Sequence, residues 1–207
     1  MNVKIENHTN LKVTLNPSED GKFAILIVEP NSTQHNNLGN VPRGKCIKIG
    51  KREFIVLDHS ADTTALIAKN AICDMEFDSD SADYSVSKVR KYLNDHFYRE
   101  LVSSVGKDTV ITHSVDLMAD DGTGKGKICR DNVSLLTTDR YRRYREFLPA
   151  TGKWWWVATR ASYGEGYARR VCCVVDGGAL NWSGCDYCGG VRPFCILRSS
   201  FSDFEEV

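Results

Sequence analysis

The stretch RRVCCVVDGGALNWSGCDYCGGVRPFCIL, residues 169–197, holds five of the eight cysteines of a 207-residue chain and lacks lysine, glutamate and histidine. Its short apolar runs are separated by glycine-rich, turn-forming residues. This pattern is typical of short strands joined by tight turns. The same texture begins after Gly152, at WWWVATRAS (154–162), so we expect strands through the C-terminal part of the chain.

Two helices are expected before these strands. In SVSKVRKYLNDHFYREL (85–101), Ser85 is the expected N-cap and the apolar positions Val86, Val89, Leu93, Phe97 and Leu101 recur at helical spacing. A second helix is expected in TTDRYRRYREFL (137–148), capped by Thr138, with Tyr141, Tyr144 and Leu148 on one face and its four arginines in solvent. Helices in the middle of the chain followed by short strands predict an α+β fold rather than a doubly wound sheet.

Residues 1–44 are predicted to be a separate attachment, and residues 45–207 the main domain. The segments VKIENHTNLKVTL (3–15) and FAILIVEP (23–30) are predicted strands, and NSTQHNNLGNVPRG (31–44) a linker. The attachment is expected to form a small β segment through which the protein assembles into a homo-oligomer.

Composition argues against several classes of partner. The chain has 27 basic and 27 acidic residues, so we expect no nucleic-acid or membrane partner. The N-terminus has no secretory signal pattern, and the apolar runs are too short to span a bilayer. A cytoplasmic protein, or one incorporated into a phage particle, is expected, with its cysteines free rather than in disulfides.

No catalytic or cofactor motif is complete. In DDGTGKGK (120–127), three residues separate Gly122 from Gly126 and Ile128 follows Lys127, so a phosphate loop is not predicted. Asp116, Asp120 and Asp121 lack the ligand spacing of a calcium loop. The five histidines share no recognised spacing with a nucleophile. We therefore predict a protein that is not an enzyme and needs no cofactor or metal.

Three explanations of the cysteine-rich stretch compete. Cys185-x-x-Cys188 has a spacing that zinc accepts, with Cys172 or Cys173 as a second arm, but no histidine is near and the second arm is incomplete. A disulfide knot needs an oxidising compartment. The third explanation is that the residue types were selected by something other than folding.

The residue types that are missing favour the third explanation. No codon ending in C encodes Lys, Glu, Gln, Met or Trp. These amino acids number 27 in residues 1–156 and two in residues 157–197, where the earlier frequency (27/156 over 41 positions) predicts about seven. Rewriting of codons that end in C leaves such a bias.

Four ordered motifs resemble those of an uncharacterised domain family of gut Firmicutes and their phages: SKVRKYLNDHF (87–97), DNVSLLT (131–137), WWWVATRAS (154–162) and GVRPFCIL (190–197). The third departs from the family pattern, with Val157-Ala158-Thr159-Arg160 in place of L-R-S. The resemblance covers about three quarters of the chain. It implies a C-type-lectin-like fold with two helices and short antiparallel strands, similar to the variable proteins of diversity-generating retroelements.

The resemblance implies ligand recognition through a variable C-terminal surface on a rigid scaffold. The apolar positions, from Trp154–Trp156 to Leu197, are expected to build the core, with Arg192 bound to loop carbonyls or a carboxylate. The expected ligand contacts are the polar and thiol residues between them: Tyr163, Tyr167, Arg169, Arg170, Cys172, Asp176, Asn181, Ser183, Asp186, Tyr187 and Cys188. The tripeptide of calcium-dependent sugar-binding lectins is absent from the C-terminal half, so a protein or peptide ligand, such as a cell-surface receptor, is expected.

Two alternatives remain from the sequence. The first is that the protein is a structural or display component of a phage or cell-surface particle, docked through residues 1–44. Less favoured is a copper-dependent oxidase related to sulfatase-modifying enzymes, which would use Cys185, Cys188 and Cys195.

Overall fold

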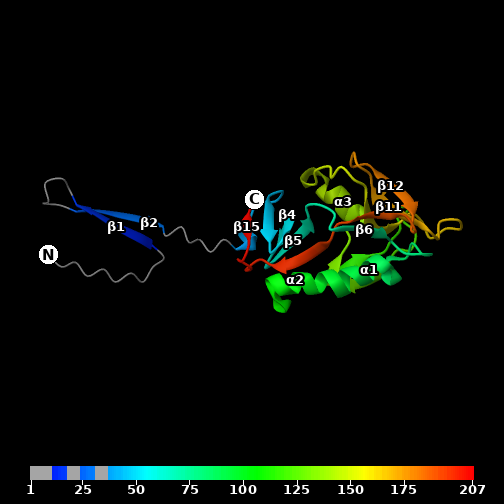
Figure 1. Cartoon of the computed structure of the whole chain (residues 1–207), viewed down its shortest axis with the longest axis horizontal. Coiled ribbons are helices and arrows are strands. Elements are labelled where there is room, and N and C mark those ends of the chain that lie inside the picture. Colours follow the sequence, from blue (N-terminus) through cyan, green and yellow to red (C-terminus); the bar gives the residue numbers. More distant parts are fainter. Residues whose placement is uncertain (1–10, 18–23, 31–36) are drawn as a thin grey trace. The chain divides into compact units, whose positions relative to one another are not determined.

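A computed structural model of the chain describes residues 11–17, 24–30 and 37–207, which divide into two units, residues 1–37 and 38–207 (Figure 1). In the smaller unit, β1 (Leu11–Pro17) pairs antiparallel with β2 (Ala24–Pro30). Both predicted N-terminal strands overlap these two, although residues 3–10 lie outside the described residues.

The boundary between the units differs from the predicted one at residue 44. Leu38 and Val41 are buried in the larger unit, and the Leu38 N–H donates to the carbonyl of Phe201 at 2.7 Å. Residues 38–44 therefore belong to the larger unit and do not form a linker, because the buried side chains of Leu38 and Val41 pack in its core.

The larger unit contains two sheets and a hairpin. The strands of the six-stranded sheet, in spatial order, are β15 (Glu205–Glu206), β3 (Cys46–Ile49), β4 (Arg52–Ser60), β5 (Thr63–Ala68), β14 (Phe194–Arg198) and β9 (Val133–Ser134). Those of the five-stranded sheet are β12 (Leu180–Gly184), β11 (Arg170–Val174), β10 (Trp155–Arg160), β13 (Cys188–Val191) and β6 (Cys73–Glu76). The hairpin is β7 (His113–Asp116) with β8 (Ile128–Asp131).

Most neighbouring strands are antiparallel, and β10 and β13 pair in parallel. The helices are α1 (Lys88–Tyr92), a π turn η3 (Leu93–Phe97), α2 (Tyr98–Val105) and α3 (Thr138–Tyr144), with 3-10 turns η1 (Leu38–Asn40), η2 (Tyr84–Val86), η4 (Lys107–Thr109) and η5 (Arg145–Phe147). The prediction of an α+β fold is confirmed.

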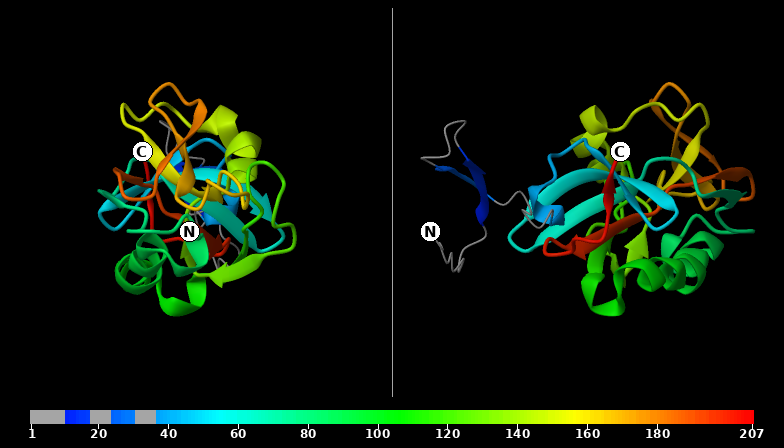
Figure 2. Two further views of the ribbon diagram at one scale, coloured as in Figure 1. Left: turned by 90° about the vertical axis from the view of Figure 1, so that its right-hand side faces the viewer. Right: turned by 60° about the vertical axis from the view of Figure 1, so that its left-hand side comes forward.

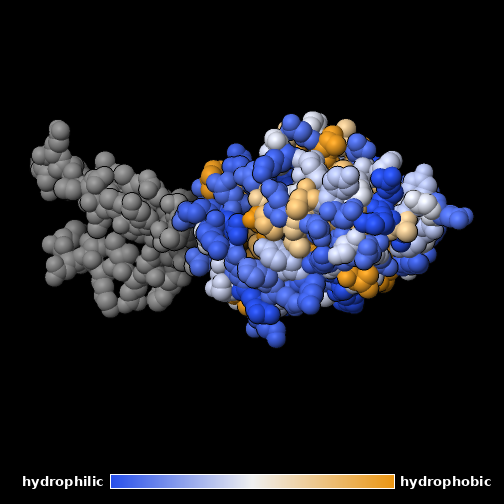
Figure 3. All heavy atoms as spheres, turned by 45° about the vertical axis from the view of Figure 1, so that its right-hand side comes forward, coloured by the Kyte–Doolittle hydropathy of each residue, from blue (hydrophilic) through white to orange (hydrophobic). Residues whose placement is uncertain are grey.

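The strands lie between the two helical segments. Figures 1 and 2 show the continuous helix α1–η3–α2 on one side of the strands and α3 on the other. Phe54 and Val56 of β4 share a buried cluster with the long helix, whereas Ile55 and Leu57 belong to the cluster around α3. Alternate residues of a strand point to opposite faces, so the six-stranded sheet is covered on both sides at β4. The outer surface is mainly hydrophilic in the view of Figure 3, with apolar residues in small separate groups.

The long helix follows the predicted periodicity but begins later. Val89, Leu93, Phe97 and Leu101 are buried, as predicted, whereas Val86 is 71% exposed. The N-cap is Ser87, whose Oγ accepts from the Arg90 N–H at 3.1 Å; the predicted cap, Ser85, instead bonds to Asp83. The helix ends at Gly106, whose φ of 80° lies in the left-handed region that glycine tolerates.

Replacing the true cap is expected to destabilise the protein. Ser87→Ala should lower the free energy of unfolding by about 1 kcal/mol, because the first turn loses the acceptor for a backbone N–H. Urea denaturation followed by circular dichroism measures this change. Ser85→Ala is the control and should cost less; a larger loss from Ser85→Ala would contradict the cap assignment.

The second helix begins at Thr138, because Thr137 rather than Thr138 provides the cap, accepting from the Arg140 N–H at 3.2 Å. Tyr141, Tyr144 and Leu148 are buried, as predicted. The prediction of four solvated arginines is wrong for Arg140, whose guanidinium lies 4.7 Å from the ring centroid of Phe194. Periodicity alone does not show that β14 passes beside this helix.

Arg192 holds the turn between β13 and β14. Its side chain is fully buried, and Nε and Nη2 donate to the carbonyls of Ala68 and Lys69 at 3.1 and 3.0 Å. The ring of Trp155 lies 4.6 Å from the guanidinium carbon. The prediction that Arg192 binds loop carbonyls is confirmed.

Candidate ligand-binding groove

A groove of about 660 Å³ crosses one face of the five-stranded sheet. The residues lining it come from β6, β11, β12 and β13, from the segment just before β10 and from the β11–β12 turn: Asp74, Gly152, Lys153, Trp154, Cys173, Val175, Asp176, Asn181, Trp182, Ser183, Cys188, Gly189 and Gly190. Of the predicted contacts, the structure brings Asp176, Asn181, Ser183 and Cys188 together here. A groove of this size accommodates a small molecule or a few residues of a peptide.

Trp154 forms an aromatic part of the groove lining. Its half-buried ring meets the ring of Trp156 edge-on, with centroids 4.7 Å apart, and lies against Gly189 of β13. A Cβ at residue 189 would collide with the Trp154 ring and approach Trp156 Nε1 to 2.7 Å. Glycine is therefore required here for the indole to lie across the strand.

One wall of the groove is the edge strand β12. Asn181 and Ser183 pair with Cys173 and Val171 of β11, so their side chains share the groove face of the sheet. Asn181 Oδ1 accepts from the Trp182 N–H at 2.8 Å, which leaves the amide NH₂ group for a ligand. This wall presents small polar groups that donate and accept hydrogen bonds.

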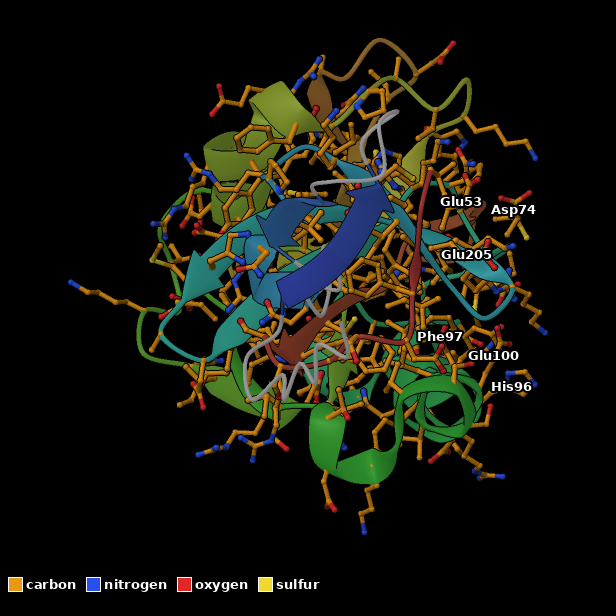
Figure 4. All side chains as sticks on the ribbon, turned by 90° about the vertical axis from the view of Figure 1, so that its left-hand side faces the viewer. Glu53, Asp74, His96, Phe97, Glu100 and Glu205 are labelled. Atoms are coloured by element: carbon orange, nitrogen blue, oxygen red, sulfur yellow. The ribbon has the colours of Figure 1, made fainter. Side chains whose placement is uncertain are left out.

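Not all of the charged side chains that line the groove form ion pairs. Lys153 Nζ lies 3.1 Å from Asp74 Oδ2, which forms a local pair at the edge strand β6. Asp74 points outward from that strand in Figure 4. Asp176, which is exposed, has no ion pair within the described residues. The groove therefore carries one negative charge without a partner.

A second group of predicted contacts, which we call the arginine–aromatic patch, lies around the β12–β13 turn. It consists of five predicted contacts, Tyr167, Arg169, Arg170, Asp186 and Tyr187, together with Trp182, which was not among the predicted residues; all six are exposed. The Arg170 guanidinium lies 4.3 Å from the Trp182 ring centroid, and Arg169 pairs with Asp186 at 2.8 Å. Because these cations are already held in place, they meet a ligand with little further loss of side-chain entropy.

Tyr163 has a structural role instead of a free surface position. It is half-buried, and its hydroxyl donates to the carbonyl of Leu117 at 3.1 Å. Lys127 Nζ lies 3.9 Å from the ring centroid, and the ring also packs on Gly124. Tyr163 therefore packs on the turn-rich loop 119–127 and holds it against the domain.

Cys172 does not contribute to either surface. It is 4% exposed, and burial raises the pKa of its thiol to about 12. Its neighbour Cys173 is also buried, because the inner strand β11 is covered on both faces. The expectation that Cys172 contacts a ligand is corrected: its thiol lies in the core around α3.

The cysteines are arranged as separate thiols. All eight are free, and the residues that the structure describes contain no group of three or more His, Cys, Asp or Glu side chains that could hold a metal ion. Cys185 and Cys195 are buried, with Cys195 in β14 of the six-stranded sheet, whereas Cys188 is exposed. The set required for the copper alternative is therefore not brought together.

Sequence analysis missed four lining residues that matter for the site: Trp154, Trp182, Lys153 and Asp74. Trp154 was assigned to the core, and Asp74 lies 78 residues before Gly152, the next lining residue in the sequence. The 47% exposure of Trp182 follows from its position on an edge strand. The only local indication in the sequence was that Trp182 is a large aromatic residue among polar neighbours.

No protein-family model, curated protein or solved structure matches this chain. Among the helices of the described residues, none has the length and apolar character needed to cross a membrane. The class of the protein defined by the fold and the groove is an α+β domain with an open surface site.

Proposed function

We propose that this protein is a non-enzymatic recognition protein that binds a protein or peptide ligand through the groove and the arginine–aromatic patch. The observation that carries the proposal is the separation of two residue sets within one stretch. Val171, Val174 and Val191 are buried in the core, while most of the polar residues between them are exposed. Substitutions on such a surface leave the scaffold intact.

The chemistry of the surface supports binding of a polypeptide. Tyrosine, tryptophan and arginine supply large contact areas at binding sites, and asparagine and serine supply adaptable hydrogen bonds. The side chains of Tyr187 and Trp182 are 64% and 47% exposed, so much of each ring is available to contact a ligand. Both sets meet at the edge strand β12, where Asn181 and Ser183 point to the groove face and Trp182 to the opposite face. A ligand that passes around this edge would contact both sets.

The finer assignment is also a proposal. We infer a C-type-lectin-like domain and a variable protein of a diversity-generating retroelement, from the four motifs and the scarcity of Lys, Glu, Gln, Met and Trp after residue 156. Sequences of this gene from several isolates test it. Variation concentrated at Asp176, Asn181 and Ser183 and the patch is expected, and uniform variation along the chain would contradict it.

A panning experiment tests the binding proposal. The full chain is immobilised and panned with a displayed random-peptide library, and the enriched peptides are titrated against it. Asn181→Ala with Trp182→Ala should weaken binding at least about tenfold, which corresponds to about 1.4 kcal/mol. Arg99→Ala, an exposed change on α2, is the control and should leave the affinity unchanged.

Two outcomes of the panning would overturn the proposal. One is the absence of any peptide enriched above an unrelated immobilised protein. The other is a set of enriched peptides whose affinity does not respond to any substitution in the groove or the patch.

A second candidate function is display on a particle, favoured by one observation. The hairpin β1–β2 belongs to a compact unit distinct from residues 38–207. Such a unit suits attachment to an assembly while the larger unit binds a ligand, and several copies would bind with avidity. Light scattering of the full chain and of residues 38–207 tests this role, which requires oligomers that the shorter chain loses.

A further inference from the structure

The charge of the groove selects among peptide ligands. Three charged residues line it, and two of them, Asp74 and Lys153, pair with each other. The remaining charge is the carboxylate of Asp176, which has neither an ion pair nor a hydrogen bond within the described residues. An unpaired carboxylate in a partly enclosed site attracts cations and repels acidic groups.

Two neighbouring guanidinium groups do not cancel this charge through a direct contact. Arg145 donates to the carbonyls of Leu148 and Gly177, at 3.1 and 3.5 Å. Arg192 lines the same small cavity as Asp176 but donates to the carbonyls of Ala68 and Lys69. Both cations are held by main-chain oxygens of the scaffold, and neither forms an ion pair with Asp176, although Arg192 Nη1 is buried without a hydrogen-bond partner.

The aromatic surface of the groove favours the same kind of ligand. The half-buried Trp154 ring is held across Gly189 and is braced edge-on by Trp156. An indole attracts a cation to its face and also packs against the methylene chain of lysine or arginine. The polar wall of Asn181 and Ser183 supplies hydrogen bonds to a peptide backbone.

We propose that the groove binds a basic side chain, lysine or arginine, of the ligand, with Asp176 pairing with its charge and Trp154 contacting its alkyl chain. This inference rests on the proposed function and specifies the chemistry of its ligand. An acidic or purely apolar side chain would leave the Asp176 carboxylate desolvated without a partner.

Nuclear magnetic resonance titration tests this inference on the full, ¹⁵N-labelled chain. The probes are blocked tripeptides with lysine, arginine, N-acetyl-lysine or glutamate between two glycines. The lysine and arginine peptides should shift the indole N–H signal of Trp154 saturably, with a dissociation constant on the order of millimolar, since one exposed contact contributes little energy. The glutamate and acetyl-lysine peptides should bind at least about threefold more weakly.

Matched variants assign the effect to one carboxylate. Asp176→Asn should weaken binding of the lysine peptide about three- to fivefold, the range expected for one exposed ion pair. Asp95→Asn, which changes an exposed carboxylate on the long helix, should leave it unchanged. Both substitutions change the net charge equally, so a difference between them reports the groove alone.

The results separate this inference from the proposed function. Equal binding of the lysine and acetyl-lysine peptides, or unchanged binding in Asp176→Asn, would overturn the inference. If panning then still enriches peptides that need Asn181 and Trp182, the recognition function stands with a ligand of different chemistry. If panning also fails, both proposals fall.

Discussion

Trp156→Ala is expected to lower the free energy of unfolding of the larger unit by about 4 kcal/mol, within the range for deleting a buried aromatic side chain. Trp156 is fully buried, and its ring packs on Phe77 with centroids 5.6 Å apart. Its Nε1 also donates to the carbonyl of Met75 at 3.0 Å, so the substitution leaves both a cavity and an acceptor without its donor.

Urea denaturation at neutral pH, followed by circular dichroism, measures this loss. Trp182→Ala is the matched control, because it removes the same side chain from an exposed position on an edge strand. That control should cost less than about 1 kcal/mol. Equal losses from the two variants would show that β12 is part of the core instead of a ligand-facing edge.

Acidification is expected to destabilise the protein through His113. Burial of the imidazole, with a smaller contribution from the Arg140 guanidinium, lowers the pKa of His113 to about 4. The unfolded chain takes up this proton near the ordinary pKa of about 6.5. Stability is therefore complete above about pH 6.5 and falls as the pH decreases toward 4. The pKa difference corresponds to a total loss of about 3 kcal/mol.

His113→Gln isolates this contribution from the other titrating groups. Between about pH 7 and pH 5, the original protein should lose about 2 kcal/mol more than the variant, as measured by urea denaturation at each pH. His113 Nε2 lies 2.9 Å from Ser134 Oγ, so the variant also costs stability at neutral pH. The test is the difference between the two pH slopes, and parallel slopes would contradict the assignment to His113.

Local patterns predicted most elements of the larger unit. The spacing of Val89, Leu93, Phe97 and Leu101 identified the long helix because one of its faces packs on the strands. Glycine-rich turns separated the C-terminal strands, as in the β11–β12 hairpin. The caps were wrong by one or two residues, since several hydroxyl residues precede each helix and only their hydrogen bonds distinguish them.

These local patterns did not predict which strands, distant in the sequence, pair with one another. Nothing in the sequence indicates that β13 lies parallel to β10 and antiparallel to β6. The burial of Arg140 against Phe194 depends on the same tertiary arrangement. Periodicity describes the two faces of an element and does not specify which element covers each face.

The candidate site was predictable where alternation was simple. Asn181 and Ser183 both face the groove because alternate residues of a strand point to the same face. Cys172 was wrong because β11 is covered on both faces, so alternate residues are equally buried. Asp74 and Lys153 were missed because this side of the groove forms only through the pairing of β6 with β13, which local sequence patterns do not indicate.

Strand order also constrains how the molecule is made. β5 gains its outer neighbour β14, and β3 gains β15, only from residues 194–206. A nascent chain leaving the ribosome therefore exposes the incomplete edges of β3–β5 until residues 194–206 have emerged. Such edges pair readily with other chains, so arrested or truncated products should depend on chaperones to stay monomeric.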